Sequence, residues 1–114
     1  MRKTQMARRG AFAGVALLAL AGCAGSQGHM RLLEQDGALR VSPSANPAAN
    51  YTVSIRNIAD VGYNPDDKAV RDKLALDYLR TQCPSGRIVG ETVLETGEYL
   101  LGRPARTYAI DVKC

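Results

Sequence analysis

Three cysteines carry most of the chemistry that this sequence offers. Cys23 follows an apolar run near the start, Cys83 precedes a Pro-Ser-Gly stretch, and Cys114 ends the chain. An odd number of cysteines does not close into a complete set of disulfides, so one of the three needs a separate role. The only histidine is His29. Two cysteines with this one histidine do not make the four-ligand set of a structural zinc site, so no metal and no cofactor are expected.

The residues before Cys23 have the layout of a bacterial export signal. Four cations lie in the first nine residues: Arg2, Lys3, Arg8 and Arg9. The apolar run AFAGVALLAL follows over residues 11–20 and is too short to span a bilayer. A buried core helix is the alternative, but cations at the start of a helix oppose its dipole, and this run has no polar face. The segment therefore predicts general export.

At the end of the apolar run, Leu20-Ala21-Gly22-Cys23 resembles the lipobox of bacterial lipoprotein precursors. The resemblance implies that the Cys23 thiol receives a diacylglyceryl group and that a signal peptidase cuts after Gly22. Residues 1–22 are then a signal peptide, and acyl chains such as palmitate on Cys23 anchor the protein to a membrane. Ala24 stands where an aspartate commonly marks inner-membrane retention. We therefore expect a cell-envelope location, at the outer membrane facing the periplasm.

The charge of the chain is concentrated in this N-terminal segment. The formal net charge is +4, from fifteen basic and eleven acidic residues. Because four of the basic residues lie in the first nine positions, the rest of the chain is formally neutral. A neutral body gives no support to nucleic-acid binding, and no nucleic-acid partner is expected.

The mature chain divides into a loose front part and one folded domain. Residues 23–50 are predicted to be the lipidated cysteine, a tether and a loosely structured segment. Within them, Asp36-Gly37 lies between two short apolar patches and indicates a local hairpin over residues 31–41. Residues 42–50, SPSANPAAN, have no periodicity and indicate a linker. Residues 51–114 are the predicted domain.

Hydrophobic periodicity predicts an α+β fold for that domain. Residues 51–56 alternate as a half-buried strand, and a helical period follows, with Asn64 as the expected N-cap and Pro65 in the first turn. Residues 86–97 are predicted to be a strand with a bulge at Gly90, and residues 106–114 a final strand. The expected fold is a small two-layer sandwich in β-α-β-β order, with one helix on a short antiparallel sheet.

Cys83 and Cys114 remain once Cys23 is assigned to lipidation. Two leftover thiols in an exported protein are usually oxidised together, so a disulfide between them is predicted. A redox pair is the alternative, but it usually needs the close C-x-x-C spacing that is absent here. The disulfide is therefore expected to be structural.

No set of residues predicts catalysis. Ser85-Gly86 lacks a nucleophile elbow, and with His29 on the tether no Ser-His-Asp set assembles. The acids Glu91, Glu95 and Glu98 are expected on the outward face and turn of a hairpin. The body of the chain, from GYNPDDKAV to RTYAIDVKC, resembles small lipoproteins of proteobacteria, and this likeness implies no activity.

One polar feature is a candidate binding site. Arg103 and Arg106 flank Pro104 in a short turn, with Tyr99 nearby, and two arginines in a rigid turn suit a carboxylate or phosphate group. An ordinary hairpin loop is the alternative reading. The sequence thus predicts a membrane-anchored envelope lipoprotein that acts as a binding or structural module, with an envelope protein or cell-wall polymer as partner. The alternative function is a hydrolase or other ligand-transforming enzyme.

Overall fold

A computed structural model describes residues 27–114 of this protein. The predicted signal peptide, the lipobox and Cys23 lie outside the described residues. The chain divides into two compact units, Met1–Leu32 and Leu33–Cys114, and each is described by itself. Residues 27–35 are helical. All strands belong to the second unit.

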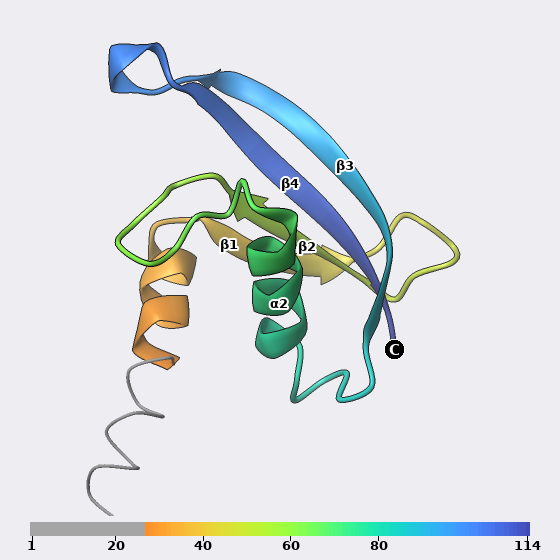
Figure 1. Ribbon diagram of the computed structural model, residues 1–114. Coiled ribbons are helices and arrows are strands. Elements are labelled where there is room, and N and C mark those ends of the chain that lie inside the picture. The colour runs from red at the N-terminus through yellow and green to blue at the C-terminus, as the bar shows by residue number, and fades with distance from the viewer. Residues whose placement is uncertain (1–26) are drawn as a thin grey trace, which may run out of the picture. The chain divides into compact units, whose positions relative to one another are not determined.

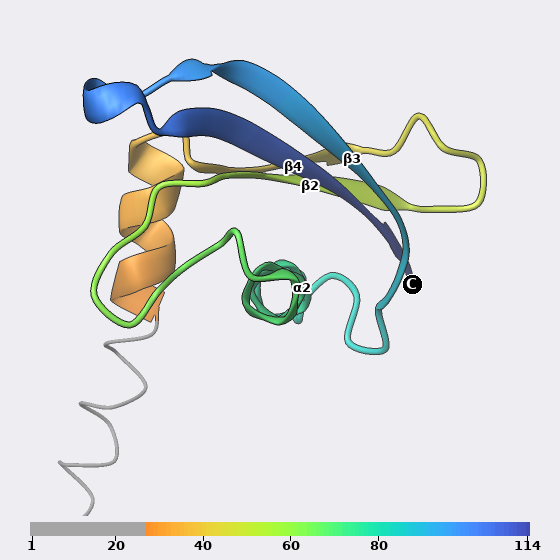
Figure 2. The same cartoon turned by 45° about the horizontal axis from the view of Figure 1, so that its top comes forward.

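The second unit is built on a four-stranded antiparallel sheet with strand order β1-β2-β4-β3. The strands are β1 (Leu39–Pro43), β2 (Tyr51–Arg56), β3 (Arg87–Glu98) and β4 (Pro104–Lys113). The helix α2 (Lys68–Tyr78) follows β2 and lies against one face of the sheet (Figure 1; Figure 2). Strands β3 and β4 form one long curved hairpin that turns at a single helical turn, η1 (Leu100–Gly102). The protein is therefore α+β, as predicted.

The core lies between the sheet and α2. Alternate strand residues are almost fully buried: Leu39, Val53, Ile55, Tyr108, Ile110 and Val112. The helical segment adds Leu74, Ala75 and Leu79. Because side chains alternate between the two faces of a strand, each buried residue leaves its neighbours on the opposite face. The periodicity predicted for residues 51–56 and for the last strand is confirmed.

The front part of the chain is more ordered than expected. The predicted hairpin over residues 31–41 is wrong: residues up to 35 are helical, and β1 begins only after the turn at Gly37. Strand β1 pairs instead with β2, and residues 44–50, expected in a linker, form the loop of that hairpin. The folded unit consequently begins before residue 51, and the element order is β-β-α-β-β rather than β-α-β-β. Pairing with β2 places Leu39 opposite buried Ile55, and Leu39 is itself buried in the core.

The helix begins later than its sequence predicts. Asp67 is the N-cap, and its Oδ1 accepts a hydrogen bond from the Ala69 amide at 3.0 Å. Asn64, the expected cap, accepts instead from the Asp66 amide at 3.1 Å and closes a turn around Pro65. This turn keeps Pro65 buried in the unit. The register shift between Ile88 and Gly90 on β3 agrees with the predicted bulge.

Candidate functional site

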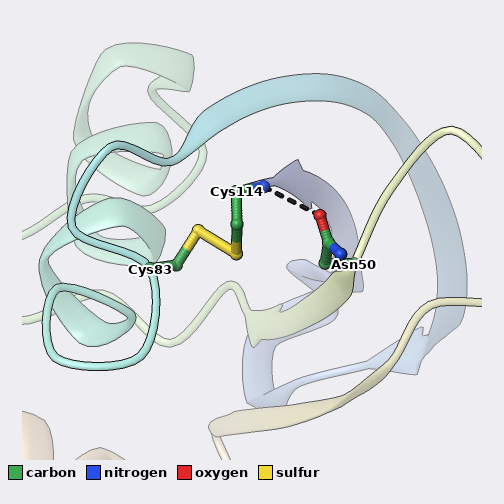
Figure 3. Close-up of a disulfide and its surroundings, with 3 residues drawn as sticks. All are labelled: Asn50, Cys83 and Cys114. Atoms are coloured by element: carbon green, nitrogen blue, oxygen red, sulfur yellow. Dashed lines mark hydrogen bonds between the residues drawn. A yellow bond between two sulfur atoms is a disulfide. The ribbon is translucent and has the colours of Figure 1, made fainter.

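A disulfide joins Cys83, in the segment after α2, to Cys114 at the end of β4 (Figure 3). The two Cα atoms lie 5.1 Å apart, and Cys83 is buried. The Cys114 amide also donates to Oδ1 of Asn50 at 2.9 Å. The bond connects the two cysteines that the sequence analysis pairs. It connects the segment after α2 to the end of β4, a central strand of the sheet.

Asn57 directly follows β2, is 1% exposed, and makes several side-chain hydrogen bonds. Its Oδ1 accepts from the Arg106 amide at 2.8 Å and from the Tyr99 hydroxyl at 3.0 Å. Its Nδ2 donates to the Pro104 carbonyl at 3.0 Å. Since buried polar groups need partners, this one amide side chain satisfies three groups at the turn end of the β3–β4 hairpin.

Asp66 extends this network from the turn before α2. The Tyr108 hydroxyl donates to its Oδ1 at 2.6 Å, and Asn57 Nδ2 donates to the same oxygen at 3.2 Å. Arg103 donates to Oδ2 at 3.3 Å. Burial raises the pKa of Asp66, but the hydrogen bonds from Tyr108, Asn57 and Arg103 together outweigh it and leave the pKa below its usual range. Asp66 is therefore held as a carboxylate.

A buried arginine connects the helix to the sheet. Arg71 is 7% exposed, pairs with both carboxylate oxygens of Glu91, and donates to the Asp66 carbonyl at 2.9 Å. Its guanidinium lies 4.0 Å from the centroid of the Tyr108 ring, a cation–π contact. The hydrogen bond from Arg71 lowers the pKa of Glu91. Glu91 was expected on the outward face of the hairpin, and that expectation is wrong because its strand register places it opposite buried Ile110.

The predicted binding residues all lie at this network, and each has a partner inside the chain. Arg103 donates to the Asn57 carbonyl at 2.7 Å as well as to Asp66, and its guanidinium lies 5.6 Å from the Tyr99 ring centroid. Arg106 pairs with Glu95 at 3.1 Å. Arg103 and Tyr99 thus connect the hairpin to the loop after β2, and Arg106 connects the two strands of the hairpin. The two arginines do not stand unpaired in the turn.

An open cleft of about 480 Å³ borders the network. It is lined by Ala59, Asp60, Gly62, Tyr63, Asn64, Asp66, Val70 and Arg103. The polar side chains of this lining are two carboxylates, an amide, a guanidinium and a phenol, with no serine, cysteine or histidine among them.

The opposite face of the sheet carries a second, smaller recess of about 270 Å³. It is lined by Asp36, Gly37, Arg40, Ser54, Arg56 and Thr107, which come from the turn before β1 and from three strands. Sequence reasoning missed this recess. The alternation of apolar and polar residues in β2 could have predicted it, because Ser54 and Arg56 lie on the face away from buried Val53 and Ile55.

Within residues 27–114, no three His, Cys, Asp or Glu side chains are grouped to hold a metal ion. No helix in that part of the chain is long and apolar enough to cross a membrane. Comparison of the chain with family models, curated proteins and solved structures finds no match. The function is therefore inferred from the sequence and the structure of this chain alone.

Proposed function

We propose that this chain is a bacterial envelope lipoprotein, anchored through lipid on Cys23, whose folded unit acts as a small binding or structural module. The observation that carries the proposal is the stretch Leu20-Ala21-Gly22-Cys23, directly after a ten-residue apolar run with four cations before it. Ala24 favours the outer membrane, with the unit facing the periplasm. The partner is an envelope protein or a cell-wall polymer.

The disulfide supports export. Disulfides persist in oxidising compartments such as the periplasm and are rare in the cytosol. With Cys83 and Cys114 joined, Cys23 is the one cysteine left for lipidation. In this role the unit works as a small two-layer sandwich, with α2 as one layer and the sheet as the other, and the face of the sheet away from α2 is the binding face.

Metabolic labelling tests the anchor. Cells that express the full chain are grown with a labelled fatty acid, and the label is measured on wild type, Cys23→Ala and Cys114→Ala. The wild type and Cys114→Ala are expected to carry label, because both retain the lipobox cysteine. Cys23→Ala is expected to carry none, since the acyl acceptor is gone. Equal labelling of wild type and Cys23→Ala would contradict the proposal.

A further inference from the structure

Most basic side chains of the second unit form ion pairs, but two arginines on one face of the sheet do not. Six cations pair with acids on α2, at its flanks or on the helix-facing side of the hairpin: Lys68, Arg71, Lys73, Arg80, Arg103 and Arg106. Arg40 and Arg56 are different. Neither guanidinium group has an ion-pair or hydrogen-bond partner among the residues that the structure describes. Both belong to the face of the sheet that lies away from α2.

The strand register brings these two arginines together. Arg40 on β1 lies opposite Ser54 on β2, and Arg56 lies two residues further along β2, opposite Thr107 on β4. Diagonal neighbours of this kind have Cα atoms roughly 7–8 Å apart, within reach of long side chains. Arg56 is also only partly exposed. Two like charges are thus held close together, one of them partly buried, with no acid bonded to either.

The recess around them is shaped as well as charged. Gly37 has a φ of 72°, and a Cβ at that position would stand 2.9 Å from Nη2 of Arg40. The Arg40 guanidinium therefore lies against the turn backbone, and a side chain at residue 37 would displace it. The hydroxyls of Ser54 and Thr107 line the same recess and make no hydrogen bond within residues 27–114. Two guanidinium groups and two hydroxyls thus offer unused donors to one space of about 270 Å³.

We propose that this recess binds the phosphate group of a ligand. One guanidinium fork already satisfies the two coplanar oxygens of a carboxylate, whereas a tetrahedral phosphate offers oxygens to donors that approach from several directions. Here the donors come from three strands. The carboxylate of Asp36 at the rim opposes a second negative charge, so the ligand presents a singly charged phosphate with a neutral or cationic group beside it. This site lies apart from the Arg103 turn and does not depend on lipidation.

Thermal unfolding tests the site. The full chain, in nonionic detergent with its disulfide intact, is unfolded with inorganic phosphate and, at matched ionic strength, with sodium chloride. At tenfold excess over Kd, phosphate is expected to raise the Tm by roughly 6–11 °C above the chloride value. Arg40→Gln and Arg56→Gln are each expected to lose most of this rise. Arg87→Gln is the matched control: it removes an exposed, unpaired cation at the far end of the same sheet and is expected to retain the rise.

A second probe identifies the source of the phosphate. Short-chain phosphatidylethanolamine, a singly charged phosphate beside a cation, is titrated in the same way. A larger shift with the lipid than with inorganic phosphate assigns a lipid headgroup, and the reverse assigns a soluble phosphate; both support the site if Arg40→Gln abolishes the shift. The Arg40 side chain is exposed, so this variant is expected to fold. An equal rise in wild type and Arg40→Gln, or no rise above chloride with either probe, would overturn the proposal.

Discussion

At the scale of single residues, the buried side chain of Asn57 joins segments that are far apart in the sequence. It lies where β2 ends, and its amide joins the loop after β2 to both strands of the long hairpin. A buried donor or acceptor that loses its partner costs about 1–3 kcal/mol. Asn57 therefore stabilises the turn end of the hairpin through several hydrogen bonds from one buried side chain.

Replacement of Asn57 tests this role. Asn57→Ala is expected to lower the free energy of unfolding by about 3 kcal/mol, because the Arg106 amide and the Pro104 carbonyl lose their buried partners. Urea unfolding of the full chain measures the change. Asn64→Ala, at an exposed position, is the control and is expected to cost less than half as much. Equal decreases in the free energy of unfolding of the two variants would show that the hydrogen bonds of Asn57 do not stabilise the fold.

The backbone conformation of Leu101 is expected to lower the stability of the fold. Its φ is 73°, in the left-handed region that β-carbon contacts disfavour in all residues except glycine, and its side chain is fully exposed. Leu101→Gly is expected to raise the free energy of unfolding by about 1 kcal/mol, seen as a Tm rise of roughly 4–8 °C. Leu100→Gly is the control, since Leu100 is equally exposed but has no positive φ, and no rise is expected there. A lower Tm for Leu101→Gly than for the wild type would show that the backbone of Leu101 is not strained.

At the scale of elements, the contact between α2 and the hairpin combines apolar packing with one buried ion pair. Leu74 and Ala75 pack into the core, while Arg71 reaches past Tyr108 to Glu91 on the edge strand β3. A buried pair of this kind is costly to break, because removal of one partner leaves the other charge buried and unpaired. The ion pair thus fixes which part of β3 lies beside the helix.

Acid unfolding tests this link. The pKa values of Glu91 and Asp66 are lowered in the folded protein, so the unfolded chain binds more protons as the pH falls. The stability from these carboxylates is present above their usual pKa values of 4.5 and 3.8 and is lost as the pH drops below them. The urea midpoint is therefore expected to fall steeply below about pH 4.5.

The variant Glu91→Gln measures how much of the stability lost in acid comes from Glu91. Glu91→Gln is expected to be less stable at pH 7, since Arg71 loses its counter-charge, and to show a shallower fall in acid. Glu98→Gln removes an exposed carboxylate near the turn of the same hairpin and is the matched control. A pH profile of Glu91→Gln parallel to that of the wild type would contradict the assigned role.

At the scale of the whole molecule, the disulfide is the main covalent constraint. Cys83 and Cys114 are separated by 31 positions, and on the chain-entropy model a loop of this length contributes about 3.5–4 kcal/mol to stability. A small domain has only about 5–15 kcal/mol in total. The bond therefore provides a large share of the stability of the folded unit.

Reduction of the disulfide tests that share. Without reductant, thiol alkylation of the folded protein is expected to modify neither Cys83 nor Cys114. With reductant, the Tm is expected to fall by more than about 10 °C, because 1 kcal/mol corresponds to roughly 4–8 °C in a domain of this size. A Cys83→Ala, Cys114→Ala double variant is the control, and its Tm is expected to be indifferent to reductant. Free alkylation of both thiols in native protein would refute the bond.

Local patterns in the sequence determined several features of this fold. The alternation of residues 51–56 and of Tyr108, Ile110 and Val112 predicted which side of each strand is buried. The glycine at residue 90 marked the bulge on β3. These predictions succeed because side-chain period and backbone freedom act over a few residues and need no distant partner.

Only the tertiary structure decided the features that depend on distant contacts. The same short apolar pattern around Leu39 fits a local hairpin or a strand beside β2, and burial of Leu39 in the shared core selects the second. Arg71 falls in the helical row that includes Ala75 and Leu79, yet nothing in that row shows that Glu91, twenty residues away, is its partner. Arg40 and Arg56 likewise become neighbours only once the register of β1 on β2 is set. Register is determined by the packing of the whole core, so a sequence pattern that repeats every two or four residues cannot specify it.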